Sequence, residues 1–395
     1  MAEIKKITLK NGKVRYRTVV DAGYDESGKR IQLTITRDSK TEVKDEQARI
    51  QSGRAAGTFI TPSKITVAEW LNQWLTYKQR DVEETTIRTY RLALIHAFDR
   101  LGHIRLQDLT EDHVQTFIDE LVARGRRKSG KPGTRLAVTT TEGVLTRLRE
   151  AFGRAVVRRL IPVNPAQYVR VSLADKKIDK RDRQRPRPWT VPEVQQFIKG
   201  IEGDRLYAPL LLSLMGLRPA EVCGQRWKDI DLQLATLEMA NTRTMLGNGT
   251  VLEKDAKTAA GERVLPLPSK ALEALKRFRA QQAREKLAAG EGYTDTGYVV
   301  VDELGMPRNT RQLREHAYKA MESSGLRKVR LYDARHSCLT YLAVNGVPDV
   351  VLAAWAGHTN ATFTKLKYVR PDVEDLRSAA DAWDSFHGGD PKAPM

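Results

Sequence analysis

The stretch Gly216-Leu-Arg218-Pro-Ala-Glu221 follows an apolar run that predicts a buried helix. Glycine ends that helix, so Arg218 stands at its terminus, with Glu221 near enough to orient the guanidinium. A second arginine lies in Tyr332-Asp-Ala-Arg335, where another helix is predicted to begin. A lone Arg–Glu pair is usually a surface ion pair. The functional interpretation therefore depends on the order and spacing of the motifs around it.

Two further motifs complete the set. Lys257 lies in a polar turn between two predicted strands, and Gly357-His358 is followed ten residues later by Tyr368. Two arginines can clamp a phosphate through paired hydrogen bonds and neutralise its developing charge. A tyrosine can act as the nucleophile and form a phosphotyrosine. Because that bond retains the phosphodiester energy, resealing needs neither ATP nor a metal, and we expect no cofactor.

The charge of the chain predicts a polyanionic partner. The 395 residues contain 67 Lys and Arg against 49 Asp and Glu, a formal net charge of +18. Such an excess in a folded protein usually indicates nucleic-acid binding. No apolar run approaches the roughly 18 residues that a membrane span needs, so we expect no membrane protein and no secreted precursor. The two cysteines, Cys223 and Cys338, provide neither a disulfide framework nor a zinc site, which fits a reducing cytoplasm.

Residues 1–60 predict a small β-sheet domain. Residues 13–19 alternate between polar and apolar side chains, and so do residues 31–36, which favours a β-hairpin. A short polar helix near residues 41–52 is expected to end at Gly53. One face of the first strand then carries three basic side chains, Lys13, Arg15 and Arg17. That face is either a DNA-binding surface or an ordinary solvated one.

Residues 64–168 predict an all-α helical bundle. The first helix begins with a capping box, Thr66-Val-Ala-Glu69, and carries Trp70, Trp74 and Tyr77 at helical spacing. This aromatic stripe is expected to pack in the core rather than to stack on bases. The exposed faces and the loop after the third helix are rich in basic residues, which suits a phosphate backbone. The candidates for DNA contact are Arg88, Arg91, Arg126, Arg127, Lys128, Arg147 and Arg154.

Residues 169–188 are strongly basic and poor in apolar side chains, which predicts an interdomain linker. Residues 189–395 predict a mixed α+β domain that is mainly helical and includes a C-terminal tail. Short strands are expected near 236–240 and 262–267, a long helix over 269–288, and a further strand over 298–302.

These motifs together resemble the tyrosine recombinases, specifically the temperate-phage and integrative-element integrases with an added N-terminal arm-binding domain. The resemblance covers nearly the whole chain and is most specific in the C-terminal motifs. It implies an arm-type DNA-binding domain in residues 1–60, a core-binding domain in 64–168 and a catalytic domain in 189–395. It also implies double-stranded DNA with core-type and arm-type sites as partner, a homotetramer on DNA, a host DNA-bending protein and an excisionase.

The resemblance assigns roles to the catalytic residues. Tyr368 would attack the scissile phosphate and form a 3′-phosphotyrosine, while Arg218, Arg335 and His358 would stabilise the non-bridging oxygens. Lys257 would be the general acid for the leaving 5′ oxygen. The free 5′ hydroxyl of the partner strand would then reverse the chemistry through a four-way junction, integrating and excising mobile DNA.

One position departs from the family pattern. The family's His-x-x-Arg motif begins here with Tyr332, whose phenol could still donate a hydrogen bond to a phosphate oxygen but is a poor base at neutral pH. His336 lies about 100° further round the helix, so we interpret it as a packing residue. The segment from Val373 to Trp383 could pack against a neighbouring protomer or within its own chain.

Two other function classes remain open from the sequence. A catalytically silent DNA-binding or architectural protein would also need the basic helices. A type IB topoisomerase would share the tyrosine chemistry but would relax DNA without strand exchange. The spacing of Tyr368 from both arginines and Lys257 argues against the silent protein, and the N-terminal sheet and helical domain favour the integrase.

Overall fold

The computed structural model describes residues 3–9, 12–24, 30–56, 59–126, 132–182, 188–245, 251–255, 262–362, 364 and 376–386. The chain divides into two compact units, residues 1–184 and 185–395. No helix in these described ranges is long and apolar enough to cross a membrane.

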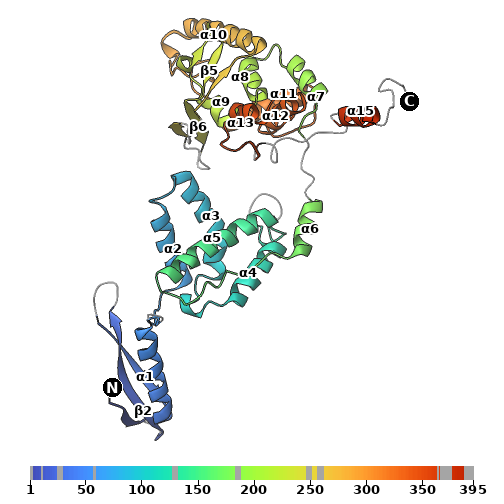
Figure 1. Ribbon diagram of the computed structural model, residues 1–395. Coiled ribbons are helices and arrows are strands. Elements are labelled where there is room, and N and C mark those ends of the chain that lie inside the picture. Colours follow the sequence, from blue (N-terminus) through green and yellow to red (C-terminus); the bar gives the residue numbers. More distant parts are fainter. Residues whose placement is uncertain are drawn as a thin grey trace. The chain divides into compact units, whose positions relative to one another are not determined.

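The N-terminal segment is a three-stranded antiparallel sheet with one helix (Figure 1). The strands are β1 (Lys5–Thr8), β2 (Val14–Tyr24) and β3 (Arg30–Arg37), in the order β1-β2-β3. The hairpin is confirmed, and β1 is an additional strand paired with β2. Helix α1 (Lys40–Ala55) begins at its N-cap Ser39 and packs on the sheet face that carries Val20 and Ile35. The opposite sheet face, which carries Arg15 and Arg17, remains outside this core.

Helix α1 is longer than expected, because it continues through Gly53 to Ala55. A glycine at a helix end usually terminates the helix by adopting a positive φ. Gly53 does not adopt one. A Cβ at its position would lie 3.4 Å from the Cβ of Phe59, an ordinary van der Waals contact, so neither φ nor space requires a glycine there.

The next segment is the expected helical bundle. Its helices are α2 (Val67–Lys78), α3 (Glu84–Arg100), α4 (Glu111–Arg124) and α5 (Val138–Val157). Capping boxes start α2 at Thr66 and α4 at Thr110, as side-chain oxygens satisfy the free N–H groups of the first turn. Trp70 and Trp74 are each only 1% exposed, which confirms their packing role. Tyr77 is the exception at 40% exposed.

The basic segment that was expected to be a linker contains a helix. Helix α6 (Leu173–Asp182) begins where the Ser172 hydroxyl accepts a hydrogen bond from the Asp175 N–H. Its Asp179 carboxylate accepts one from the N–H of Val138, at the start of α5, 3.1 Å away. These caps offset the repulsion among its lysines and arginines. The helix therefore attaches to the bundle instead of extending away from it.

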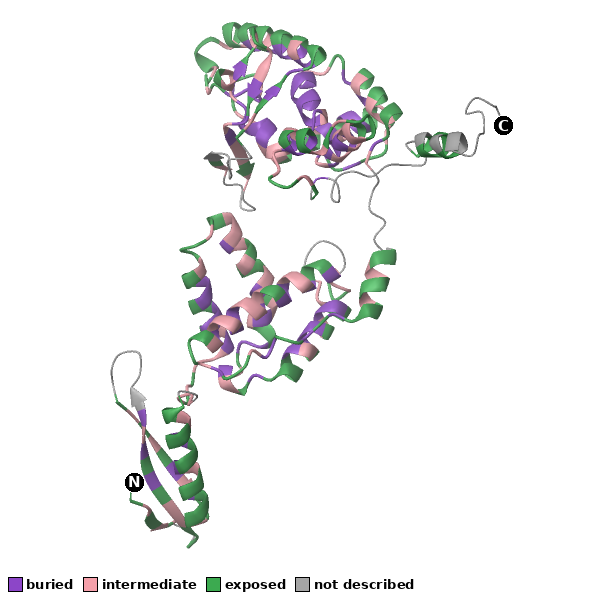
Figure 2. Cartoon of the chain, in the orientation of Figure 1, coloured by how far each residue is buried: buried purple, intermediate pink, exposed green. Residues whose placement is uncertain are grey.

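The second unit is mainly helical, with two small sheets (Figure 1). Its helices are α7 (Val191–Gly200), α8 (Tyr207–Leu214), α9 (Pro219–Gly224), α10 (Ser269–Ala289), α11 (Thr310–Ser323), α12 (Asp333–Val344), α13 (Asp349–Ala356) and α15 (Arg377–Phe386). Its strands are β4 (Ile230–Asp231), β5 (Thr236–Glu238), β6 (Asn241–Met245), β7 (Val251–Asp255) and β8 (Val264–Pro266). The sheets are ordered β4-β5-β8 and β6-β7. Figure 2 shows that the buried residues of this unit concentrate on α8 and the elements around it.

The strand expected over 298–302 does not form. Tyr298 and Val301 make only isolated bridges, to Arg226 and Pro307. The run Val299 to Val301 is nevertheless fully buried, so its apolar character reflects core packing and not a ladder. Periodicity cannot distinguish these two cases in so short a run.

Candidate active site

Arg218 occupies the N-cap position of α9, immediately before Pro219 at the first helical position. Its backbone N–H donates to Glu221 Oε2 at 2.8 Å, and its Nη1 donates to Glu221 Oε1 at 2.6 Å. Its Nη2 also reaches the carbonyl of Gly357, at 3.4 Å. The Arg218 side chain is 30% exposed, so it is oriented by protein groups and still accessible to a ligand.

Arg335 lies in the first turn of α12 and is only 1% exposed. Its Nη1 donates to the carbonyl of Gly216 at 2.7 Å, and its Nη2 donates to the carbonyl of Ala356. Gly216 has a φ of +93°, and a Cβ there would lie 3.4 Å from Cys338 Sγ, so the turn before Arg218 requires glycine. Arg335 therefore connects the turn that presents Arg218 with the end of α13.

His358 follows the left-handed cap of α13, where Gly357 has a φ of 64°. Its Nε2 lies 3.0 Å from Arg335 Nη2, and its Nδ1 lies 2.8 Å from the hydroxyl of Thr364. A guanidinium can only donate, so Nε2 accepts and the ring proton sits on Nδ1, from which it is donated to Thr364. Thr364 in turn donates to the carbonyl of Asn360 at 3.2 Å. The imidazole is thereby held in one orientation.

The electrostatics of the site centre on Glu221, which is 4% exposed. Burial by itself would raise the pKa of this carboxyl, but the positive charges of Arg263 and Arg218 lower the pKa overall. Arg263 lies 3.2 Å from Glu221 Oε2 and donates from Nε to the carbonyl of Trp355 at 2.9 Å. A charged Glu221 thus holds two arginines.

Two of the three remaining candidates, Lys257 and Tyr368, lie outside the described residues. The described chain on either side of Lys257 is β7, which ends at Asp255, and Arg263, which precedes β8. Tyr332 is the N-cap residue of α12 and packs edge to face with His336, with ring centroids 6.0 Å apart. The structure therefore brings together Arg218, Arg335 and His358.

Sequence reasoning missed the role of Arg263. The residue was visible as the first position of Arg263-Val-Leu-Pro-Leu, but an arginine beside a short strand is normally solvent-exposed. Its side chain is only 9% exposed here. No local pattern indicates that its partners are Glu221 and the Trp355 carbonyl.

Two family models match the chain. The phage integrase family matches residues 190–375, and the phage integrase N-terminal SAM-like domain matches residues 66–122. Together they cover more than half of the sequence. The chain belongs to the phage integrase family.

Curated relatives of this integrase align along most of its length. A XerC-like tyrosine recombinase of Caldanaerobacter subterraneus is 26% identical over 373 residues, which covers 90% of this chain and 92% of the relative. An integrase of Streptomyces ambofaciens is 26% identical over 380 residues and covers 91% of each chain. The integrase is accordingly a tyrosine recombinase.

Solved structures share its fold. The Tn1549 transposon integrase in complex with circular intermediate DNA superposes with a TM-score of 0.62 at 20% identity, covering 81% of this chain and 99% of that one. A lambda integrase dimer bound to a core site gives a TM-score of 0.53 at 15% identity, covering 93% and 97%. The combination of a small N-terminal sheet, a helical domain and a mainly helical catalytic domain is thus confirmed.

The predicted DNA-contact arginines of the integrase include a row on α5. Arg147 lies over the ring of Tyr90 at 4.3 Å, and Arg154 lies over the ring of Tyr77 at 4.5 Å. Stacking on an aromatic face holds a guanidinium in place while its N–H edges stay available.

Other basic candidates differ in their surroundings. Arg91 is exposed, Arg88 is half-buried, and Arg126 donates to the carbonyl of Arg135 at 3.3 Å. Arg127 and Lys128 lie outside the described residues. Arg149, another arginine of α5, donates to the carbonyls of Ala166 and Val169, so its role is structural.

On the N-terminal sheet, two of the three candidates share one carboxylate. Asp38 lies 3.2 Å from Lys13 Nζ and 2.7 Å from Arg15 Nε. Arg17 donates to the hydroxyl of Thr36 on the neighbouring strand at 3.3 Å. The basic face is therefore partly neutralised within the domain.

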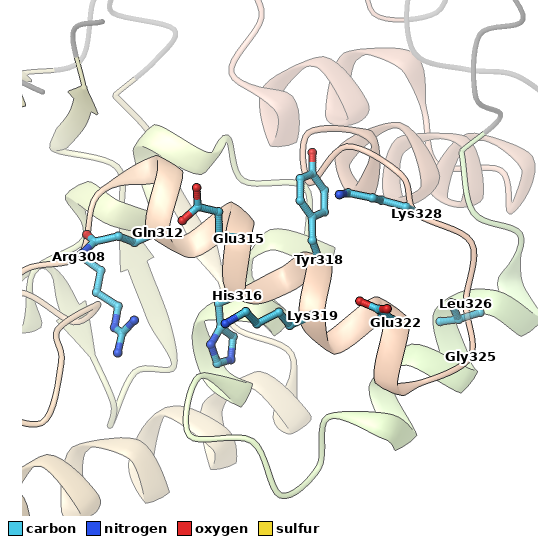
Figure 3. Close-up of a pocket in the computed structure, with 10 residues that line it drawn as sticks. All are labelled: Arg308, Gln312, Glu315, His316, Tyr318, Lys319, Glu322, Gly325, Leu326 and Lys328. Atoms are coloured by element: carbon cyan, nitrogen blue, oxygen red, sulfur yellow. The ribbon is translucent and has the colours of Figure 1, made fainter. Parts of the chain in front are cut away.

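A pocket of about 790 Å³ lies along α11 in the second unit. Figure 3 shows that polar side chains of α11, including Glu315, Lys319 and Glu322, line it, with Lys328 beside Tyr318. Its walls contain both acidic and basic side chains and none of the described candidates Arg218, Tyr332, Arg335 and His358. The pocket therefore does not contribute to the site described above.

Proposed function

We propose that this integrase is a site-specific DNA recombinase that integrates and excises mobile DNA. One observation carries the proposal. Arg218 and Arg335 hydrogen-bond to the carbonyls of two consecutive residues, Gly357 and Ala356, immediately before His358. Groups from three distant parts of the sequence thus meet at one backbone turn, where a phosphate could replace those carbonyl contacts.

In the proposed reaction, the phenol oxygen of Tyr368 attacks the scissile phosphorus, the phenolic proton passes to solvent, and the bond between phosphorus and the 5′ oxygen breaks. The products are a 3′-phosphotyrosine and a 5′ hydroxyl, whose proton comes from Lys257. Arg218 and Arg335 stabilise the non-bridging oxygens, and Tyr332 donates to one of them. His358 contributes from Nε2 once that nitrogen is protonated and no longer accepts from Arg335. The 5′ hydroxyl of the partner strand then attacks the phosphotyrosine, releases Tyr368 and builds the four-way junction. Two such rounds exchange both strands.

The domains divide this work. Residues 1–60 bind arm-type sites through the basic sheet face, 64–168 bind the core-type site through Arg88, Arg91, Arg147 and Arg154, and 189–395 carry the chemistry. The basic segment 169–188 connects the two units and tracks the duplex. A lambda integrase tetramer bound to a Holliday junction, with a TM-score of 0.51, supports a homotetramer here too. Leu376, just before α15, and Trp383, on α15, are both exposed, which supports packing of the tail against a neighbouring protomer.

The proposal places the integrase in the cytoplasm of a bacterial host, with a DNA-bending protein and an excisionase as partners. The test is a nicked suicide duplex that carries the crossover site, incubated with the full chain and then denatured. We expect a covalent protein–DNA adduct whose linked peptide contains Tyr368. A duplex that stays entirely free contradicts the proposal, and relaxation of a plasmid without an attachment site would favour a topoisomerase.

We predict that the Asp38 carboxylate weakens the binding of the N-terminal domain to arm-type DNA. The hydrogen bond from Lys13 lowers the pKa of Asp38, so the carboxylate is charged and competes with DNA phosphates for Lys13 and Arg15. We expect Asp38→Asn to tighten binding to an arm-type duplex by roughly three- to tenfold at low salt. Band-shift titrations at several salt concentrations measure this.

The matched control is Asp21→Asn, which removes a carboxylate that pairs with Arg30 and Arg54 in the same domain. Its arm-site affinity should change less than that of Asp38→Asn. Equal gains for the two variants would show a general charge effect and would contradict a specific role for Asp38.

A further inference from the structure

Arg263 connects two parts of the active site although it is not one of the expected catalytic residues. Its Nη1 and Nη2 lie 3.3 Å and 3.2 Å from the two oxygens of Glu221. Its Nε donates to the carbonyl of Trp355, 2.9 Å away. Glu221 also binds Arg218, and Trp355 lies three residues before His358 on α13. One side chain therefore contacts the supports of both Arg218 and His358.

The burial of this cluster makes its charge balance important. The side chains of Glu221 and Arg263 are 5% and 9% exposed, so water screens their charges poorly. The charged groups that lower the pKa of Glu221 are Arg263 and Arg218. Two further groups of the site, Arg335 on α12 and His358 just after the cap of α13, hydrogen-bond to each other. Without Arg263, one of the two cations that lower this pKa is absent while the burial remains, so the pKa of Glu221 would rise.

A protonated Glu221 can no longer hold both the backbone and the guanidinium of Arg218 through a charged carboxylate. One of its oxygens accepts from the Arg218 backbone and the other from the Arg218 side chain, at 2.8 Å and 2.6 Å. A proton on either oxygen weakens one of these bonds and removes the charge. The Arg218 guanidinium would then lose its fixed orientation while the domain remains folded.

We propose that Arg263 is a positioning residue of the recombination reaction. By holding Glu221 and the Trp355 carbonyl together, it fixes the position of Arg218 relative to the turn that carries His358. The inference rests on the proposed function and deepens it. It assigns to Arg263 no contact with DNA, because its side chain is occupied within the protein and nearly inaccessible.

The experiment compares full-length Arg263→Met and Arg263→Gln with wild type. The single-turnover rate of adduct formation on the suicide duplex is measured between about pH 5.5 and pH 8.5, with site binding measured in parallel. We expect site affinity within about threefold of wild type and a cleavage rate lowered by about tenfold to a hundredfold near pH 7. Because charged Glu221 is the working form, the deficit should grow as the pH falls.

Two controls separate positioning from stability. Arg205→Met removes another poorly exposed Arg–Glu pair of the same unit, in which Arg205 lies 2.7 Å from Glu285. It should lower the melting temperature but leave the cleavage rate and its pH profile unchanged. The double variant Arg263→Met/Glu221→Gln has no titrating carboxyl at this position, so its deficit should not vary with pH.

The outcomes are decisive in both directions. A wild-type rate in both Arg263 variants overturns the proposal, and so does a deficit that is constant across pH or that Arg205→Met reproduces. Failure of the proposed function is distinguishable, since wild type itself would then form no adduct. If Arg263→Met does not bind the site, the profile of Arg263→Gln, which can still donate to the Trp355 carbonyl, decides the question.

Discussion

Replacing Tyr368 with phenylalanine is expected to lower covalent adduct formation by at least about 10⁴-fold, because the nucleophilic oxygen is removed. The substitution deletes one atom, so folding and DNA binding should not change. Denaturing electrophoresis of a labelled suicide duplex measures the adduct, and a band shift on the same preparation measures binding.

Two other tyrosines of the catalytic domain serve as comparisons. Tyr341 is exposed on α12, and Tyr341→Phe should leave the adduct unchanged. Tyr332→Phe removes only a proposed hydrogen bond to phosphate, so it should slow the reaction by about tenfold and still form the adduct. An undiminished adduct in Tyr368→Phe, or its loss in Tyr341→Phe alone, would show that the nucleophile has been assigned wrongly.

Replacing Arg335 with lysine is expected to reduce cleavage by roughly 10²- to 10³-fold or more while crossover-site binding persists. Lysine keeps the charge but lacks the planar fork that reaches Gly216, Ala356 and His358 at once. Most of the binding free energy should come from the many phosphate contacts of the other domains, so affinity should change little. Single-turnover cleavage and band-shift titration separate the two effects.

Arg335→Lys should also lower the free energy of unfolding, by about 1–3 kcal/mol, because buried carbonyl groups lose their donor. Arg218→Lys is the matched comparison, since the Arg218 side chain is 30% exposed and its loss should cost activity with a smaller loss of stability. Thermal unfolding of both variants tests this difference. Arg335→Lys with a wild-type cleavage rate would remove Arg335 from the catalytic set.

Much of the local structure was predictable from the sequence. The capping box at Thr66 lies where α2 begins, because side-chain caps act within one turn of the backbone. The alternation in residues 13–19 and 31–36 correctly indicated β2 and β3. The ion pair between Arg218 and Glu221 was also accessible, since three residues in a helix separate them.

The errors share a cause. The buried run Val299–Val301 was mistaken for a strand, and helix α6 within the basic segment was not predicted. In each case the outcome depended on a partner distant in sequence. Asp179 of α6, for example, caps α5 across more than 40 residues. The composition of a segment does not indicate which distant part of the chain it packs against.

The sequence by itself determined the class of chemistry, because two arginines, a lysine, a histidine and a tyrosine occur in one order and spacing within a chain of charge +18. Only the tertiary structure decided how those groups are held. Arg335 contacts Gly216 and Ala356, which lie 119 and 21 residues away along the chain, and Arg263 joins Glu221 to Trp355. Contacts of this kind form only when the core packs, since they depend on which backbone carbonyls and carboxylates the fold brings within hydrogen-bonding distance.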